Sequence, residues 1–226
     1  MTIDQPIQLQ TVERAERLSV RTAEILRDAI VNGTLPAGSD IPIPRIAKLC
    51  GVSATPVREA LVHLAEAGLV TVHSQGVHIT EPSLEGLRAA FEVREAVEGM
   101  TARLAAARRT DEESASLLEV ARRSVEVAGG TDVKVFREWD SRFHNGVTGL
   151  SRSPHLERYA HNALDLSQTL RNLRPVHQRF RAASAHRHIE IAESIAAGDG
   201  NAAEELMRLH VREVLAHIVE TIDAGA

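Results

Sequence analysis

The chain has 226 residues, of which 43% are hydrophobic and only 3% aromatic, and its formal net charge is −5. This length suffices for two domains of modest size, and a core built mostly from Ala, Leu, Ile and Val favours helices. We find no apolar run as long as a membrane span and no signal peptide, so we expect no membrane partner. The single cysteine, Cys50, excludes a disulfide framework and indicates a reducing, cytoplasmic location.

The net charge also argues against extensive contact with nucleic acid. Residues 1–80 contain seven basic and eight acidic side chains, so this part of the chain has no basic excess. A local basic face can still support sequence-specific binding, and a dimer doubles the number of phosphate contacts. We therefore expect any non-specific DNA binding to be weak.

The N-terminal part of the chain is predicted to start loosely and then to become helical. Residues 1–18 lack a strong pattern and are expected to form a loose arm. Apolar periodicity over residues 20–32 predicts a helix, with Ile25, Ala29 and Ile30 facing inward.

Residues 45–67 predict a helix–turn–helix. Gly51 suits a left-handed turn between the helices, and Ser53 stands where the N-cap of the second helix, residues 54–67, is expected. The inward positions of that helix are Val57, Leu61, Leu64 and Gly68, and the outward positions are Thr55, Arg58, Glu59 and Val62. Polar residues that face outward near the N-terminal end of a helix suit reading of a DNA major groove. An ordinary amphipathic helix pair fits the same pattern.

The segment after this helix pair indicates a wing. Residues 69–73 and 77–80 are rich in β-branched side chains and are separated by Ser74-Gln75-Gly76, which is a hairpin signal. A helix–turn–helix followed by a hairpin is rarer than either part alone. The combination therefore predicts a winged helix–turn–helix domain over residues 1–80.

The segment VSATPVREALVHLAEAGLV resembles the signature of the GntR-type winged-helix transcription regulators, and the resemblance covers about residues 20–80. Ala54 stands where these regulators commonly carry arginine, and Ile43 and Pro44 stand where a polar or basic residue is common. We expect a homodimer on a palindromic double-stranded DNA operator, because one winged helix with so little basic charge should bind poorly alone. The residues expected to contact DNA are Arg45, Ser53, Ala54, Thr55, Arg58, Gln75 and Gly76.

From residue 84 onward the sequence predicts helices and no strand. The helices are expected over residues 84–107, 111–128, 132–149, 153–172, 176–197 and 201–223. Ser83 is placed to cap the first helix, and Asn201 with Glu204 is typical of a capping box at the start of the last. Helices joined by short breaks indicate a bundle. The predicted fold class is thus mainly α, with a winged domain over 1–80 and an all-helical domain over 84–226.

Four polar residues are predicted on inward faces of this bundle. Asp140 and His144 stand four apart and so share one face of a helix. His188 and His210 stand 11 residues before and 11 residues after Asp199, which lies in a turn. Antiparallel packing at that turn puts both imidazoles at the same height, about 16 Å from the turn. Three imidazoles and a carboxylate that converge predict a divalent metal site, and a hydrogen-bonded histidine cluster is the alternative.

The helical part resembles the FCD effector domain of the FadR subfamily over residues 84–223. The residues Asp140, His144, His188 and His210 match the metal ligands of that domain. The resemblance implies zinc or nickel as the metal and a small carboxylate as the effector.

A carboxylate effector also needs a cation. Arg94 shares a helix face with Leu87 and Phe91 and is our first candidate, the alternative being a surface pair with Glu98. Further candidates are Arg171 and Arg174.

The sequence thus predicts a ligand-responsive, DNA-binding transcription regulator, in particular a repressor of genes for carboxylate metabolism. Two alternatives stay open. The same Asp and His residues could hold an activated water in a metal-dependent hydrolase, although the sequence has no HExxH motif. The chain could also be a helical metal-storage or interaction module whose winged helix binds protein.

Overall fold

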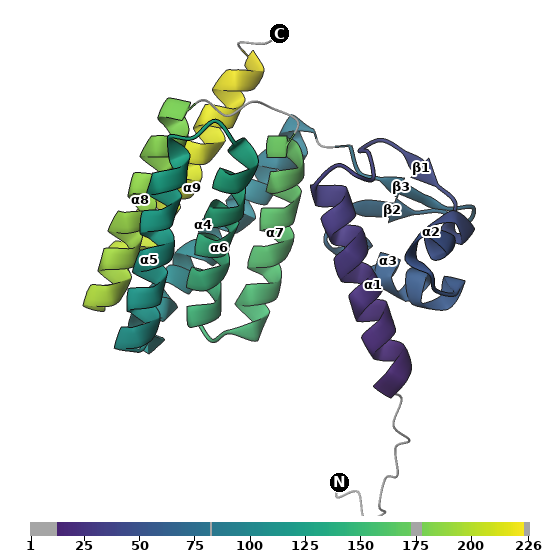
Figure 1. The fold of residues 1–226 in the computed structure, drawn as a ribbon, viewed down its shortest axis with the longest axis horizontal. Coiled ribbons are helices and arrows are strands. Elements are labelled where there is room, and N and C mark those ends of the chain that lie inside the picture. The colour runs from purple at the N-terminus through teal and green to yellow at the C-terminus, as the bar shows by residue number, and fades with distance from the viewer. Residues whose placement is uncertain (1–12, 82, 173–177, 224–226) are drawn as a thin grey trace, which may run out of the picture. The chain divides into compact units, whose positions relative to one another are not determined.

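A computed structural model describes residues 13–81, 83–172 and 178–223. The chain divides between residues 81 and 82 into two compact units (Figure 1). Nearly all the regular structure is helical, which confirms the mainly α fold class. In the described part of the chain, no helix has the length and apolar character needed to span a membrane.

The first unit begins with helix α1 (Glu13–Val31), which packs against helix α3 (Ala54–Glu66). The predicted loose arm is therefore wrong for residues 13–18, and residues 1–12 lie outside the described residues. Leu26 and Ile30 of α1 are buried, whereas Ile25 is 44% exposed, so its predicted inward position is also wrong. Leu26 takes the inward place because it lies four residues before Ile30, about one helical turn.

Helix α2 (Ile43–Cys50) leads into α3 through the predicted left-handed turn. Gly51 has φ +67°, and the next N–H, that of Val52, donates to the carbonyl of Ala47 over 3.0 Å. This bond closes the end of α2 in the manner of a Schellman motif. Ser53 takes the N-cap position of α3, but its hydroxyl makes no capping hydrogen bond. The third residue of α3 is Pro56, which has no N–H to donate and so removes one of the two usual donors to an N-cap side chain.

The wing is a three-stranded antiparallel sheet with strand order β1-β3-β2. Its strands are β1 (Asp40–Ile41), β2 (Val70–Val72) and β3 (Val77–Ile79). The hairpin of β2 and β3 was predicted, whereas β1, which precedes α2, was not. Gly76 lies at the edge of β3 where that strand meets β1. A Cβ atom on Gly76 would stand 2.7 Å from the Ile41 carbonyl oxygen, so only glycine fits there without moving the sheet.

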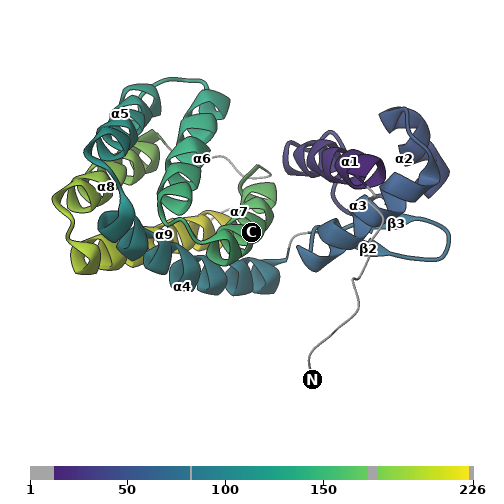
Figure 2. The same ribbon diagram turned by 90° about the horizontal axis from the view of Figure 1, so that it is seen from below.

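The second unit is a bundle of helices, and it contains no strand among the described residues. The helices are α4 (Leu84–Arg108), α5 (Asp111–Ala128), α6 (Val133–Leu150), α7 (Pro154–Asn172), α8 (Gln178–Ala197) and α9 (Gly200–Asp223). Helix α4 packs against α6, α7, α8 and α9, and α5 packs against α6 and α8 (Figure 2). Helix α4 is therefore the element that most of the bundle shares.

Side chains at the helix ends fix where the bundle turns. The Ser83 hydroxyl accepts from the N–H of Gly86 over 3.0 Å, so the predicted cap of α4 is confirmed. The predicted capping box of Asn201 and Glu204 is wrong: α9 begins at Gly200, and the Asp199 carboxylate accepts from the N–H of Ala202 over 3.0 Å. Asp199 wins because it lies one residue before the helix, where its carboxylate reaches the free N–H groups of the first turn.

The position of Gly76 generates a stability prediction. Gly76→Ala places a methyl group against the Ile41 backbone, so we expect it to lower the free energy of unfolding of the winged unit by roughly 1–3 kcal/mol. Chemical denaturation followed by circular dichroism measures the loss. The control is Gly149→Ala near the end of α6, where a Cβ meets nothing within 4 Å. That substitution should be neutral or stabilise by up to about 1 kcal/mol. Equal stability of the two variants would show that β1 does not constrain Gly76.

Candidate metal centre and nucleic-acid interface

Three helices bring the four predicted ligands into the interior of the bundle. Asp140 and His144 lie on α6, His188 on α8 and His210 on α9, and each is at most 2% exposed. Helices α8 and α9 pack against each other, and the His188 and His210 ring centroids lie 4.9 Å apart. Equal spacing from the turn at Asp199 thus does place both imidazoles at one level of the bundle.

The three imidazoles form the centre of the site. Among the described residues, His144, His188 and His210 each offer a nitrogen such that all three atoms lie within 4.8 Å of one another. The shortest distance joins His144 Nε2 to His210 Nε2, at 3.3 Å. In a tetrahedral site, two nitrogens that each bind one zinc ion at about 2.1 Å lie about 3.4 Å apart. The 3.3 Å between His144 and His210 already matches this spacing, and the nitrogen of His188, within 4.8 Å of both, would complete the set by moving closer to them.

Asp140 lies beside this trio. Its Oδ1 atom is 3.7 Å from His188 Nε2, and the residue is 1% exposed. The Asp140 carboxylate therefore lies next to the imidazole of His188. The group of atoms within 4.8 Å of one another contains the three imidazole nitrogens and no oxygen of Asp140. A set of three nitrogens with one neighbouring oxygen suits a first-row divalent ion.

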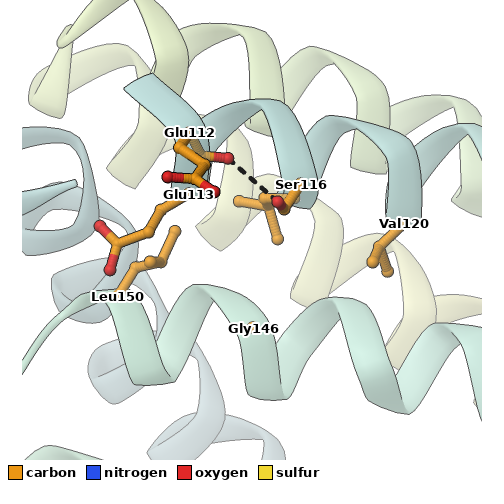
Figure 3. Close-up of a pocket in the computed structure, with 7 residues that line it drawn as sticks. Glu112, Glu113, Ser116, Val120, Gly146 and Leu150 are labelled. Carbon is orange, nitrogen blue, oxygen red and sulfur yellow. Dashed lines mark hydrogen bonds between the residues drawn. The ribbon is translucent and has the colours of Figure 1, made fainter. Parts of the chain in front are cut away.

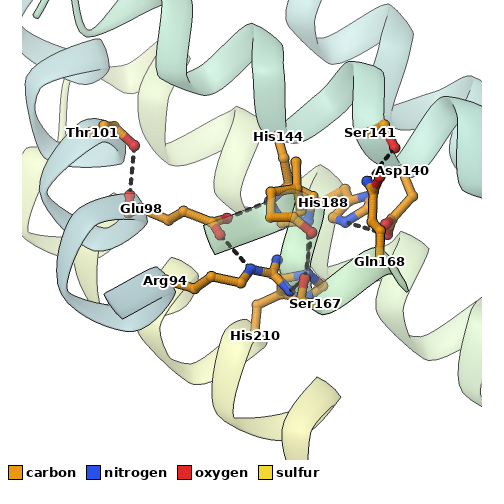
Figure 4. A network of polar contacts seen from close by, with 11 residues as sticks. Arg94, Glu98, Thr101, Asp140, Ser141, His144, Ser167, Gln168, His188 and His210 are labelled. Atoms are coloured by element: carbon orange, nitrogen blue, oxygen red, sulfur yellow. Dashed lines mark hydrogen bonds and ion pairs between the residues drawn. The ribbon is translucent and has the colours of Figure 1, made fainter. Parts of the chain in front are cut away.

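Two residues of α4 extend the site, as Figure 4 shows. The Glu98 carboxylate places Oε2 2.6 Å from His144 Nδ1 and Oε1 2.6 Å from Arg94 Nε. The sequence left open whether Arg94 faces inward or pairs with Glu98 at the surface. The structure combines the two, because Arg94 does pair with Glu98 but the residues are only 0% and 2% exposed. The contact of Glu98 with His144 was not predicted.

The arginine itself is held on several sides. Arg94 Nη1 donates to Ser167 Oγ on α7 over 3.2 Å, and the guanidinium lies 4.7 Å from the centre of the Phe91 ring. Its third nitrogen, Nη2, is buried and has no hydrogen-bond partner within the described ranges. A buried N–H group that lacks a partner costs free energy, so this atom suits an acceptor supplied by a ligand. Of the further candidate cations, Arg174 and the Arg171 side chain lie outside the described residues.

The charges of the site favour metal binding. Burial raises the pKa of Glu98, but the Arg94 guanidinium and His144 outweigh it and lower that pKa to about 2, so the carboxylate is ionised. Burial, followed by the neighbouring His188 and His144, holds the pKa of His210 well below its usual value. His210 is therefore neutral near pH 7, and a neutral imidazole has the free lone pair that a metal requires.

A separate groove lies between α5 and α6, and no histidine lines it (Figure 3). It has a volume of about 350 Å³ and is lined by Glu112, Glu113, Ser116, Leu117, Val120, Gly146 and Leu150. The Ser116 hydroxyl donates to the Glu112 carbonyl over 3.0 Å, and the Arg152 guanidinium binds Glu113 at 2.9 Å. These polar groups are thus partnered inside the domain, so the groove adds no group to the metal centre.

The winged unit presents the residues that were predicted to contact DNA. The exposed ones are Arg45, Ser53, Ala54, Thr55, Arg58 and Gln75, and Gly76 is half-buried. Arg58 lies on the outer face of α3, opposite the buried Val57 and Leu61. The structure gives Gly76 a packing reason for being glycine, independent of DNA.

Comparison with known proteins identifies both units. Residues 18–78 match the bacterial regulatory proteins of the gntR family, and residues 89–213 match the FCD domain. A relative named "Probable D-xylose utilization operon transcriptional repressor", from Paenarthrobacter nicotinovorans, is 32% identical and covers 95% of this chain and 97% of its own. The HTH-type transcriptional repressor RspR of Escherichia coli is 27% identical over 84% of each chain.

The fold has a match among solved structures. The structure of E. coli McbR/YncC superimposes with a TM-score of 0.78 at 18% identity, covering 90% of this chain and 97% of that one. Both of these sequence relatives are named as transcriptional repressors, the first as a probable one, and nothing in these comparisons supports the hydrolase alternative. The chain therefore belongs to the gntR family of bacterial regulatory proteins, and it is a DNA-binding transcription regulator with an FCD effector domain rather than an enzyme.

Proposed function

We propose that this regulator is a homodimeric repressor whose FCD domain senses a small carboxylate at a divalent metal ion. One observation carries the proposal: three buried imidazoles converge beside a buried guanidinium. The metal would be held by His144, His188 and His210, with Asp140 as a further ligand. Zinc or nickel fits this set because both accept imidazole and carboxylate donors.

The chemical class of the effector follows from the groups that the described residues leave without a partner, which are open coordination positions on the metal and one guanidinium nitrogen. When bound, the ion supplies positive charge and coordination positions that four protein ligands do not fill if it takes five or six. Arg94 Nη2 offers a second donor, buried and without a partner in the described part of the chain. A carboxylate is the group that can bind a metal and accept from a guanidinium at once. A small molecule is required because the site is enclosed by the bundle.

Repression is proposed from the relatives, two of which are named as repressors. The first of them is named for D-xylose utilization, and we extend to this chain only the idea of a catabolic operon. The effector controls DNA binding if it binds one arrangement of the dimer more tightly than another, and its effect cannot exceed that difference in affinity.

The proposed metal site can be tested by metal analysis and thermal unfolding. Protein purified without a histidine tag should hold about one zinc or nickel ion per chain, and chelation should lower its melting temperature, because the unfolded chain has no such site. His188→Ala should remove the metal and the response to effector while leaving operator binding intact. The control is His186→Ala, on the same helix but exposed. A wild-type protein that takes up no added zinc or nickel and melts identically with chelator would identify a hydrogen-bonded histidine cluster instead.

The proposed DNA contact of helix α3 can be tested at Arg58. Arg58→Ala should weaken operator binding by roughly 1–3 kcal/mol if this guanidinium reads a base. A gel shift with the DNA upstream of the chain's own gene measures it, with circular dichroism to verify folding. Arg21→Ala on α1 is the matched control, since it removes the same charge from an exposed side chain of the same unit. Equal binding by the two variants would exclude Arg58 from the interface.

The proposed homodimer can be tested by footprinting and by light scattering. We expect two protected half-sites related by a palindrome in footprinting, because a dimer doubles the phosphate contacts of a unit without basic excess. Light scattering at micromolar concentration should give twice the mass of 24.6 kDa. A monomer that still binds its operator tightly is the contrary result.

A further inference from the structure

We propose that Glu98 is a positioning residue that orients His144 toward the metal and connects it to Arg94, so that metal and effector strengthen each other's binding. The inference rests on the proposed metal site and goes beyond it, because Glu98 is not one of the expected ligands. Both of its carboxylate oxygens are in use at 2.6 Å, one toward His144 and one toward Arg94.

The first step concerns the imidazole. Glu98 Oε2 lies 2.6 Å from His144 Nδ1, and the other oxygen of this carboxylate contacts the Arg94 guanidinium. A carboxylate beside one imidazole nitrogen attracts the hydrogen to that nitrogen, which here is Nδ1. The lone pair then resides on Nε2, which lies 3.3 Å from His210 Nε2 inside the cluster. The Glu98–Nδ1 contact has the separation of an ion pair but not the alignment of a hydrogen bond. Glu98 thus acts on His144 by its charge and proximity.

The second step concerns the arginine. Arg94 and Glu98 lie four residues apart on α4, which places them on one helix face. The Phe91 ring and Ser167 hold the guanidinium, and its Nη2 atom is the one that the described residues leave without a partner. An effector carboxylate bound at Nη2 would contact the Arg94 guanidinium, which Glu98 also contacts through Nε. With metal and effector bound, Arg94, Glu98 and His144 would therefore link the two through one continuous series of contacts.

Binding of metal and binding of effector are linked thermodynamically. If an effector at Arg94 strengthens metal binding through Glu98, then the metal must strengthen effector binding by the same factor. Partners that orient a ligating histidine in this way typically change metal affinity by roughly 10–100-fold when removed. A purely structural Glu98 would change stability and leave this coupling as it was.

The test measures the zinc affinity of the full-length protein by competition with a chromophoric chelator at constant pH. Glu98→Gln should bind zinc roughly 10–100-fold more weakly than wild type. The matched control is Glu95→Gln, which removes the same charge from α4 at a partly exposed residue whose contact is Arg212 Nε at 3.7 Å. Glu95→Gln should bind zinc as wild type does. The proposal is overturned if Glu98→Gln and Glu95→Gln bind zinc equally well.

A double-mutant cycle tests the connection to Arg94. Arg94→Met alone should weaken zinc binding, and the pair Arg94→Met with Glu98→Gln should bind zinc no more weakly than Glu98→Gln alone, because both act through one contact. Additive losses would overturn the connection. The double variant also provides a protein for this test if a single variant does not fold because of its unpaired buried charge, since the double variant removes both charges together. Failure of wild-type protein to bind zinc would refute the proposed metal site itself, a result distinct from unchanged affinity in Glu98→Gln.

Discussion

The helical domain depends on one buried ion pair. Arg94 and Glu98 are both nearly inaccessible to solvent, and burying an unpaired charge costs several kcal/mol per ion. Removal of one partner would leave the charge of the other buried and unpaired. Each residue also has a further contact, Arg94 with Ser167 and Glu98 with His144. The helix that touches most of the bundle, α4, therefore carries both charges of the site, and the imidazoles of α6, α8 and α9 lie beside them.

Aromatic residues form apolar walls beside this arrangement. The chain has only four phenylalanines, and two of them border the charged groups. Phe91 lies under the Arg94 guanidinium, and the Phe143 ring stacks on His188 with centroids 4.1 Å apart. Apolar walls lower the local dielectric constant, so each charged contact inside them is stronger than it would be at the surface. Phe91 and Phe143 thus contribute to the electrostatics of the domain as well as to its packing.

Features that repeat along one element could be predicted from the sequence, and features made by two elements could not. The helices of the bundle end within two residues of their predicted bounds wherever those ends are described, because apolar periodicity and capping act locally. The meeting of His188 with His210 was predictable from equal spacing about Asp199. Strand β1 has two residues, too few for any period, and forms only because β3 lies beside it. The contact of Glu98 with His144 joins α4 to α6, and no local spacing reports it.

The equal spacing of the two histidines from the turn at Asp199 also limits how this part of the chain can change length. One residue added within α8 after His188, or within α9 before His210, rotates that imidazole by about 100° and moves it by 1.5 Å along the axis. The site would lose a nitrogen although the helix itself remained intact. The loop between α5 and α6, residues 129–132, contributes no side chain to the site and carries no such restriction. Insertions and deletions accumulating in this domain should thus be confined to connections other than the path from α8 to α9.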